Sequence, residues 1–444
     1  MPSLKLLLRF VVVAVLVVLL LVPLLLIRST IQDRERYRDQ AIEKVAQSRA
    51  GAQSLIGPVR VVPWTRQHTV EVADAESGRR KVESRLEQGY ELQMPSRLHV
   101  TGKLRPDERR IGLFRVPVYS WQAQLKAEFA DQPYLAVEGR TYGIPYLALG
   151  IADVRGLVGT PNLRVDGRSV SLQPGAGALE RASKGLHAPL PLDGDAAAGV
   201  QRSGNKVELE FVLDGTRALS VIPVGDDTRV ALESSWPHPS FGGSFLPNER
   251  RIDTSGFAAE WGVSSLASAA QAQLTRQLAG NGGAVESIDV ALVDPVDVYT
   301  QADRASKYGL LFVLLTFVGF VLFELIKQLR IHPLQYLLVG LALAIFFLLL
   351  LSLSEHIAFW QAYAVSAAAC IGLQAFYLSG VLRSRARGMG FAVMLTALYG
   401  VLYGLLVSEN NALLMGSLLL FGILAAVMWV TRNVDWYELG ARLR

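Results

Sequence analysis

Hydrophobic and polar positions divide this chain into membrane-spanning and extramembrane parts. One apolar segment stands alone near the N-terminus, and five more follow one another closely within residues 308–431. Each has roughly the 20 apolar residues that a helix needs to cross a bilayer. The predicted spans are Leu8–Ile27, Tyr308–Ile326, Leu334–Leu353, Phe359–Leu382, Met389–Val407 and Ala412–Thr431.

The charges beside these spans predict their orientation, because Lys and Arg concentrate in short cytoplasmic connectors. The two connectors Ser354–Ala358 and Ser408–Asn411 contain no Lys or Arg, and each carries one glutamate. All ten flanking cations fall on the opposite side: Lys5, Arg9, Lys327, Arg330, Arg383, Arg385, Arg387, Arg432, Arg442 and Arg444. Both termini are therefore predicted in the cytoplasm, and the large intervening domain is predicted outside it.

We expect the first span to be an uncleaved anchor. Its apolar core is longer than the central region of a signal peptide, and no small-x-small cleavage site follows it closely. The predicted class is thus an α + β membrane protein with six transmembrane helices, one N-terminal and five C-terminal. Its parts are 1–28, the N-terminus and first helix; 29–306, a β-rich outer domain with a juxtamembrane helix; 307–431, a five-helix bundle; and 432–444, a cytoplasmic tail.

Alternation of apolar and polar residues predicts strands in the outer domain. Tyr119–Phe129 alternates without a fault, and Val207–Leu213 repeats the pattern, as expected for half-buried strands. Shorter candidates are Val59–Val62, Leu163–Leu172, Leu219–Val224, Arg229–Glu233 and Ile288–Val293. Stretches rich in Gly and Pro separate them, which favours antiparallel sheets packed as a sandwich or an open barrel.

Two helices and one boundary are also predicted in this domain. Ile31–Arg49 is rich in charged helix formers and is followed by Gly51, a plausible stop. Ser264–Leu278 has an apolar stripe at spacing four that includes Leu266. The loop around Leu186–Asp195 is the candidate for a subdomain boundary.

Composition limits the functions of the outer domain. The chain has a net charge of +5, but residues 29–306 contain 32 basic and 34 acidic residues, so the basic excess lies beside the membrane. Nucleic-acid binding therefore has no electrostatic footprint. The single cysteine, Cys370, lies in a predicted span, which excludes disulfides, thiol catalysis and cysteine-based metal sites from the outer domain.

Motifs of known enzyme chemistry are missing from the sequence. There is no Walker A loop, G-x-S-x-G elbow or H-E-x-x-H helix, and no two histidines are spaced at i+3 or i+4. Ser203–Lys206 fits S-x-x-K, but it contains a glycine and has no companion motif, so we interpret it as a turn. We predict no catalytic residue, no cofactor, no metal site and no enzymatic activity.

The stretch Ser234–Pro247 is the candidate interaction loop. Trp236, His238, Phe241 and Phe245 alternate there with prolines and glycines. Proline fixes an extended backbone and aromatic rings supply contact area, so a binding loop is one interpretation. The alternative is a long connection held onto the sheet by its own aromatic side chains.

A second candidate surface lies on the cytoplasmic side. It comprises Arg330, His332, Arg432, Asp435 and Trp436. The arginines suit anionic lipid or a cytoplasmic partner, and tryptophan suits the headgroup level.

The spans themselves are almost free of ionisable groups. Glu324 is the only one, and it lies near the inner edge; Gln374 is polar but neutral. Ion-coupled transporters place ionisable groups near the bilayer midplane. The sequence therefore disfavours a coupled transporter or a charged pore, and leaves open the handling of lipid or another apolar ligand.

Several strings, in order along nearly the whole chain, resemble the CreD family of inner-membrane proteins of Gram-negative bacteria. The most specific are Ser235–Phe241 (SWPHPSF) and His332–Leu341 (HPLQYLLVGL). The others are Ile56-Gly57-Pro58 with Val61-Val62-Pro63, Phe245-Leu246-Pro247, Asp303–Tyr308 (DRASKY), Leu353–His356 (LSEH) and Thr431–Tyr437 (TRNVDWY).

This resemblance implies a multi-pass protein of the bacterial inner membrane with six spans, cytoplasmic termini and a periplasmic domain between the first two helices. Expression of such proteins is tied to a two-component system that responds to envelope and metabolic stress, and they affect envelope integrity and tolerance of toxins or β-lactams. The family has no established reaction and no catalytic residues to carry over.

We therefore expect a non-enzymatic protein that supports cell envelope integrity and the envelope stress response through its periplasmic domain. Its expected partners are the lipid bilayer and an envelope protein, a lipid or a peptidoglycan-related component, with no nucleic acid. Two alternatives are a carrier or flippase of an apolar envelope precursor, and a membrane stress sensor or regulator.

Overall fold

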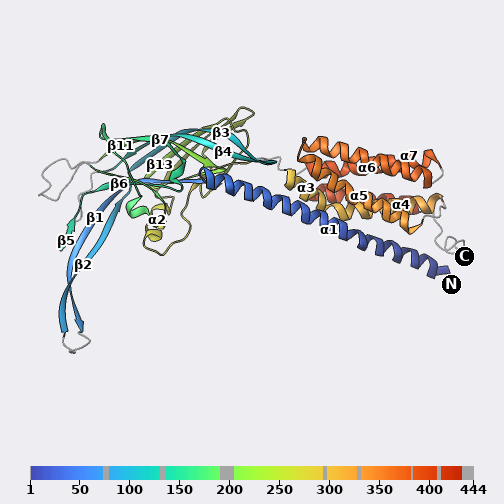
Figure 1. The fold of residues 1–444 in the computed structure, drawn as a ribbon, viewed down its shortest axis with the longest axis horizontal. Coiled ribbons are helices and arrows are strands. Elements are labelled where there is room, and N and C mark those ends of the chain that lie inside the picture. The colour runs from blue at the N-terminus through green and yellow to red at the C-terminus, as the bar shows by residue number, and fades with distance from the viewer. Residues whose placement is uncertain are drawn as a thin grey trace. The chain divides into compact units, whose positions relative to one another are not determined.

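In the computed structural model the chain forms two compact units, each described separately below (Figure 1). The helical unit contains Met1–Arg38 and Val296–Arg444, and the β-rich unit contains Asp39–Pro295. The structure describes residues 2–73, 80–130, 137–190, 205–293, 298–327, 332–381, 384–407 and 412–432.

Apolar helices build the helical unit. They are α1 (Pro2–Ser48, which continues into the β-rich unit), α3 (Val298–Lys307), α4 (Gly309–Lys327), α5 (Pro333–Ser354), α6 (Phe359–Val381), α7 (Arg385–Val407) and α8 (Ala412–Thr431). Among the described residues, four helices are long and apolar enough to cross a membrane: Ala14–Ser48, α5, α6 and α7. The pair α3 and α4, bent by 44°, adds a fifth if it counts as one span, and α8 contains a shorter apolar stretch. Membrane-spanning helices are thus confirmed, while the count of six stays a prediction.

Glycines allow α1 to approach its neighbours in the helical unit. A Cβ atom on Gly340 of α5 would lie 2.1 Å from Cδ1 of Leu20, and one on Gly309 would lie 3.1 Å from Cδ2 of Leu24. Both leucines are buried. Small residues let membrane helices pack closely, so the glycine of HPLQYLLVGL is explained by the contact between α5 and α1.

The same string also sets the start of α5. His332 is the N-cap: its Nδ1 accepts a hydrogen bond from the Leu334 N–H at 3.2 Å, and its own N–H donates to Gln335 Oε1 at 3.0 Å. Pro333 occupies the first helical position, where its missing N–H costs nothing. This reciprocal arrangement satisfies donors that a helix start leaves free.

Two sheets form the β-rich unit. The first contains β1 (Gln53–Ala73), β2 (Arg80–Gln93), β5 (Arg140–Tyr142), β6 (Tyr146–Ile151), β9 (Gln173–Pro174), β10 (Gly185–Pro189), β12 (Ala218–Ile222), β14 (Pro239–Gly243) and β17 (Ile288–Leu292). The second contains β3 (Arg97–Ile111), β4 (Phe114–Glu128), β7 (Leu157–Val165), β8 (Arg168–Val170), β11 (Lys206–Thr216), β13 (Asp227–Ser234), β15 (Glu249–Asp253) and β16 (Gly256–Ser264).

The strand orders are β14-β17-β12-β1-β6-β10-β9, with β2 and β5 attached to β1, and β15-β16-β13-β3-β4-β11-β7-β8. The inner faces of both sheets contribute to one hydrophobic core, so the unit is a sandwich. The predicted alternation of β4 and β11 is confirmed; Trp121 of β4 is fully buried and meets Phe211 of β11 edge-on, with ring centroids 5.5 Å apart.

Several predictions for this unit are wrong in detail. The sheets are not purely antiparallel, because β1 pairs with β12 and β13 pairs with β3 in parallel. Leu163–Leu172 is not one strand: Asp166 and Gly167, with φ of 51° and 80°, form a tight turn between β7 and β8. Such positive φ angles suit a two-residue hairpin turn.

The predicted helix at Ser264–Leu278 begins later than expected. Ser264 ends β16, Leu266 is 98% exposed, and α2 runs only from Ala270 to Leu278. The apolar stripe that does reach the core begins at Ala270. Leu186, at the predicted subdomain boundary, lies inside β10 and pairs with Leu149 of β6, so the chain does not leave the sandwich there; the rest of that loop, 191–195, lies outside the described residues.

Candidate functional site

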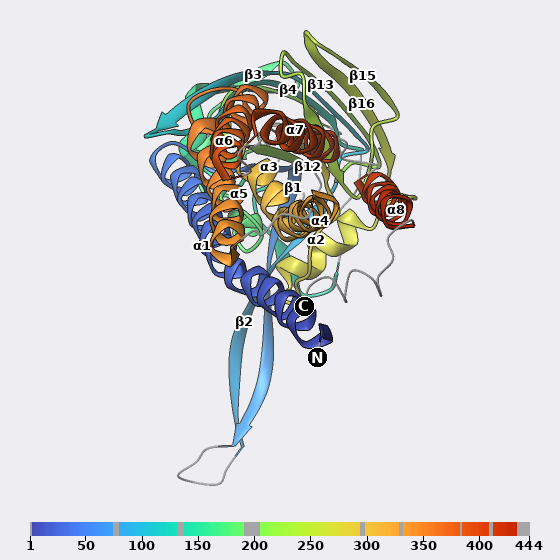
Figure 2. The same ribbon diagram turned by 90° about the vertical axis from the view of Figure 1, so that its right-hand side faces the viewer.

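A two-stranded arm extends from the sandwich (Figure 2). We define the arm as residues 63–73 of β1 and 80–90 of β2. The two strands pair without a break from Arg60 opposite Gln93 to Ala73 opposite Arg80. β5 adds a third strand only at Trp64–Arg66, and beyond this point the described chain gives the arm no further strand.

The root of the arm is held by a buried arginine. Arg60 is 7% exposed, and its guanidinium donates hydrogen bonds to Gln93 Oε1 at 2.5 Å, to Asn205 Oδ1 at 3.1 Å and to the Ala130 carbonyl at 3.2 Å. It also lies over the ring of Phe129, 5.3 Å from the centroid. A buried charge is tolerated when its donors are satisfied in this way, so these contacts fix the direction in which the arm leaves the sheet.

A second group of contacts holds the opposite side of the root. The guanidinium of Arg140 stacks on Trp64, 3.9 Å from the ring centroid, and pairs with Glu91 at 3.0 Å. The Tyr142 hydroxyl donates to the same carboxylate at 3.2 Å. Gly89 is required here, because a Cβ atom would lie 2.3 Å from the Trp64 ring.

The two faces of the arm differ in chemistry, because side chains alternate along paired strands. One face is uncharged and carries Thr65, Gln67, Thr69, Ser84, Leu86 and Gln88. The other carries the charged or titratable residues Arg66, His68, Arg85 and Glu87. Residues 66–69 and 84–88 are all exposed, so both faces of the arm are in contact with solvent.

The predicted interaction loop uses its aromatic rings inside the sandwich. Phe241 lies in β14 at the edge of the first sheet, and its ring meets those of Phe257 and Trp261 edge-on, with both centroid distances 5.6 Å. The Trp261 indole N–H donates to the Phe245 carbonyl at 3.2 Å. These contacts match the alternative interpretation, in which aromatic side chains hold the connection onto the sheet.

The other two residues of this loop are more accessible. Trp236 is half-buried, and its indole N–H donates to the Val293 carbonyl at 3.0 Å. His238 is exposed. The structure therefore brings the four predicted residues onto one edge of the sandwich, and their role in binding stays a prediction.

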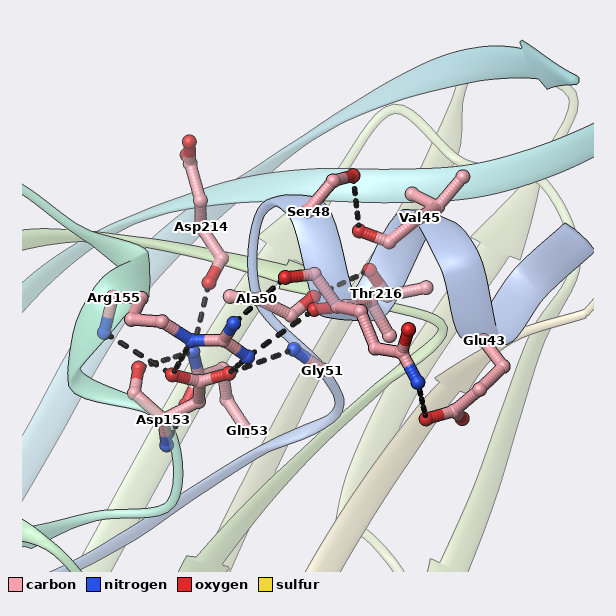
Figure 3. A network of polar contacts seen from close by, with 12 residues as sticks. Glu43, Val45, Ser48, Ala50, Gly51, Gln53, Asp153, Arg155, Asp214 and Thr216 are labelled. Carbon is pink, nitrogen blue, oxygen red and sulfur yellow. Dashed lines mark hydrogen bonds and ion pairs between the residues drawn. The ribbon is translucent and has the colours of Figure 1, made fainter.

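A polar network joins the end of α1 to the sandwich (Figure 3). Arg49 donates two hydrogen bonds to the Asp214 carboxylate, at 2.6 and 2.9 Å. Arg155 donates to the Gln47 carbonyl at 2.7 Å, which satisfies an acceptor that the end of a helix leaves free. Arg155 also pairs with Asp153 at 2.6 Å.

Gln53 is the centre of this network and is 1% exposed. Its amide donates to the carbonyls of Asp153 and Asp214 at 3.0 and 2.9 Å, and its Oε1 accepts from the Asp153 N–H at 3.1 Å. Thr216 adds a bond to the Ala50 carbonyl at 2.7 Å. Each bond spans a large sequence separation, so the network fixes the helix end to the two sheets.

The charges at this joint are mixed. Hydrogen bonds from Arg155 hold the pKa of Asp153 below its ordinary value, against a smaller opposing effect of burial. An open pocket beside the network is lined by Glu43 and Asp153 and by Arg155 and Arg217. Because both signs of charge are present, the pocket has no preference for an anion or a cation, and we interpret the region as a structural joint.

In the helical unit, Glu355 of the string LSEH is paired with α1. Its side chain is 6% exposed and lies 3.4 Å from Nε of Arg34. The Tyr299 hydroxyl of α3 donates to the same carboxylate at 3.2 Å. This carboxylate therefore links α1, α3 and the end of α5.

Asp303 of the string DRASKY makes a second link. Its carboxylate lies 3.7 Å from Nε of Arg28 on α1 and 2.7 Å from Nζ of Lys307. Two acidic residues of the family strings thus meet two arginines of α1, and both strings are accounted for by helix packing.

The predicted cytoplasmic surface is only partly visible. Arg330, Asp435 and Trp436 lie outside the described residues. His332 is engaged as the N-cap of α5, and Arg432 is exposed, with its guanidinium 5.8 Å from the ring centroid of Trp429. A cytoplasmic interface stays a prediction.

Sequence reasoning missed the arm and the pairs of α1 with Glu355 and Asp303. The arm has polar residues on both faces, so it lacks the apolar alternation that marks a half-buried strand. The ion pairs join residues far apart in the chain, and no spacing rule reveals such a pairing. Within the described residues, no group of three His, Cys, Asp or Glu side chains is placed to hold a metal ion.

Solved structures give only remote likenesses. The M1 zinc metallopeptidase of Deinococcus radiodurans is 9% identical, with a TM-score of 0.22, over 45% of this chain and 42% of that one. A two-domain M1 zinc metallopeptidase bound to L-arginine is 8% identical, with a TM-score of 0.23 and the same coverage. These scores are too low to support an argument about fold or activity.

Sequence comparison gives a clear answer. The family model described as "Inner membrane protein CreD" matches residues 5–437. The inner membrane protein CreD of Escherichia coli (strain K12) is 38% identical over 427 residues, which cover 95% of this chain and 91% of that protein. With its apolar helices and large β-rich region, the chain belongs to the CreD family of inner membrane proteins.

Proposed function

We propose that this protein supports cell envelope integrity without catalysing a reaction, and that its sandwich contacts another envelope component from the periplasmic side. The arm is the observation that carries this proposal. Its root is fixed by Arg60 and by the stack of Arg140 on Trp64, whereas its described outer part, 66–69 and 84–88, is exposed. A rigid root with free faces is what a contact element requires.

The energetics of the arm support the same conclusion. A two-stranded ribbon that packs against nothing is marginally stable in water. Its outer edges also present unpaired N–H and C=O groups, which proteins normally protect. Both costs fall when a partner adds a strand or covers a face, so a bound partner gives a physical reason for an arm of this length.

For the membrane arrangement we propose six spans, with the parts 1–28, 29–306, 307–431 and 432–444 placed alternately as the flanking charges predict. Both termini would be cytoplasmic and the sandwich periplasmic. The support is the distribution of Lys and Arg, which lie beside one set of helix ends and are missing from the two short connectors.

Single cysteines test this orientation. The chain contains only Cys370, which is buried, so Cys370→Ala gives a background without thiols. On it, Ser169→Cys places an exposed thiol on β8, and His332→Cys places one at the start of α5. A membrane-impermeant maleimide should label the first in intact spheroplasts and the second only after lysis. The opposite pattern would reject the proposed orientation.

Substitutions on the arm test the contact. Thr69→Lys with Gln88→Lys introduces charge on the uncharged face without touching the root, and Ser169→Lys on β8 is the matched exposed control. In a strain lacking the protein, the control should restore exclusion of a hydrophobic dye and the arm variant should not, at equal membrane levels. Full activity of the arm variant would remove the arm from the proposal.

The other candidate surface and the other function classes need separate tests. His238→Ala examines the exposed residue of the Trp236–Phe245 loop. A chain that ends at residue 306 keeps the anchor and the sandwich but lacks the bundle. If that chain restores the barrier, the carrier and the signalling alternatives both fail; if it accumulates normally and does not restore it, the bundle takes part.

A further inference from the structure

Hydroxyl groups in the membrane helices follow a common rule, and one departs from it. A serine or threonine in a helix usually donates to a carbonyl three or four residues earlier. Four do so at 2.7–2.9 Å: Thr316 to Phe312, Ser354 to Leu351, Ser379 to Phe376 and Thr396 to Ala392. Ser366 of α6 is completely buried, and its Oγ has no partner among the described residues.

Gln374 lies two turns further along α6. It is 2% exposed, and neither Nε2 nor Oε1 finds a hydrogen-bond partner in the described chain. Residues separated by four or eight positions share a helix face, so Ser366, Cys370 and Gln374 form one polar stripe. Cys370 is buried, and its thiol donates weakly to the Ala342 carbonyl of α5 at 3.6 Å.

A fourth polar group comes from α7. The Tyr399 carbonyl accepts a hydrogen bond from the Tyr363 hydroxyl at 2.7 Å, which ties α7 to α6. The hydroxyl of Tyr399 lies beside the Cys370 thiol, yet it too lacks a hydrogen bond to any described residue. The unpartnered groups therefore gather between α6 and α7 rather than being scattered through the bundle.

Such groups are costly where water is scarce. A buried donor or acceptor without a partner costs about 1–3 kcal/mol, and the hydrocarbon core of a bilayer supplies no water to relieve that cost. Native interiors satisfy nearly all of their buried polar atoms. Three residues with unpartnered groups between the same two helices thus indicate that something else provides the missing hydrogen bonds.

The chemistry of the stripe defines the class of guest. Serine, glutamine, cysteine and tyrosine are all neutral here, so a charged guest would have no counter-charge beside them. The Gln374 amide offers both a donor and an acceptor, so its partner must accept and donate as well. A phosphate or an ammonium group fails the first condition, and a plain hydrocarbon chain fails the second.

We propose that a neutral hydrogen-bonding guest occupies the space between α6 and α7 along the polar stripe. The guest is either water or a neutral hydroxyl or amide group of a lipid. This inference does not depend on the arm or on the proposed function, since it concerns only the helical unit.

Cys370 is a built-in probe for this site, because it is the only thiol of the chain and lies in the middle of the stripe. Silver ion is small and charged, so it reaches a buried thiol through water. The full-length protein in native membranes is treated with silver ion, unfolded, and assayed with a fluorescent maleimide for the thiol that remains free. In parallel, the purified protein is examined by native mass spectrometry for a retained lipid.

Water as the guest predicts that silver blocks Cys370, and that Gln374→Leu slows the block by about tenfold, the effect of one lost hydrogen bond. A lipid predicts no block in the native protein, but one retained lipid that Gln374→Leu abolishes. Ser366→Ala is the milder variant and carries the test if Gln374→Leu does not accumulate. Thr396→Val, which removes a hydroxyl already bonded to its own helix, should change neither result.

Two outcomes would overturn the proposal. One is a native protein with neither silver access nor a retained lipid. The other is silver access or lipid retention that is equal in the native protein, Gln374→Leu, Ser366→Ala and Thr396→Val, because the guest would then not be held by the stripe.

Discussion

The sandwich and the helical bundle differ in how they treat buried polar side chains. In the sandwich every buried polar side chain among the described residues bonds a group from elsewhere in the chain; these are Gln53, Arg60, Gln93, Asn205, Asp214, Thr216, Thr228 and Ser234. In the bundle, Thr316 and Ser354 bond only their own helix, and Ser366 and Gln374 bond no described residue.

This difference separates two uses of burial. In the sandwich, Gln53 and Arg60 hold together segments that are distant in sequence, so their cost of desolvation is offset by bonds that define the fold. In the bundle, apolar packing and close contacts at glycines hold the helices together, and the unpartnered polar groups add nothing to that packing. Buried polarity is structural in one unit and available for a guest in the other.

The largest expected effect comes from matched substitutions in the two units. Gln53→Leu leaves two backbone carbonyls and one N–H unpaired in the sandwich, which should lower the free energy of unfolding by about 3 kcal/mol or more. Gln374→Leu strands no backbone group and should cost far less. Denaturant midpoints of the solubilised full chain, followed by tryptophan fluorescence, check this; equal losses would break the comparison.

Packing should dominate in the bundle. Gly340→Val places a side chain where Leu20 now lies and should destabilise the contact of α1 with α5 by about 1–3 kcal/mol, the usual cost of overpacking. Leu20→Ala in the same chain makes room and should recover part of the loss. Thermal midpoints in detergent measure both, and a wild-type midpoint for Gly340→Val would show that α1 does not need this close approach.

A smaller effect is expected from the ion pair of Arg34 with Glu355. Glu355→Gln should weaken it by about 1 kcal/mol, because one partner is buried and the other is 40% exposed. Asp33→Asn removes a carboxylate from a pair whose side chains are 71% and 50% exposed, and it should have no measurable effect. Limited proteolysis of α1 compares the two, and Arg34→Glu combined with Glu355→Arg should restore protection.

The smallest effect concerns pH at the joint of α1. The pKa of Asp153 is lowered in the folded state by Arg155, so its stabilising contribution is fully present above the unfolded pKa of about 3.9. It is lost as pH falls through the lower folded value. The stability difference between the native chain and Asp153→Asn should therefore be constant above about pH 5 and shrink below pH 4. A difference that grows with acidification would contradict this sign.

Local patterns account for the parts of the fold that the sequence predicts correctly. The alternation in β4 and β11 and the long apolar runs of α5–α7 each reflect burial of a contiguous segment, which one window of sequence contains. The start of α5 is similarly local, since His332, Pro333 and Gln335 together form the cap.

The errors arise where distant residues decide the outcome. Leu266 fits the apolar stripe of α2, but β16 extends through Ser264 and the turn that follows leaves this leucine in solvent. β3 carries many charged residues, yet it is a full strand because β4 and β13 flank it. The same holds for the site: Arg60 gives no sign in sequence that Gln93 and Asn205 will surround it.

The continuity of β1 has a mechanical consequence. Its outer half is one side of the arm, and its inner half lies between β12 and β6, so a pull on the arm runs along a single peptide backbone into the middle of the sheet. Hydrogen bonds to neighbouring strands then oppose the force together, in shear, instead of opening one after another. The strand begins at Gln53, beside the last turn of α1, so tension on a captured partner would arrive at the helix end.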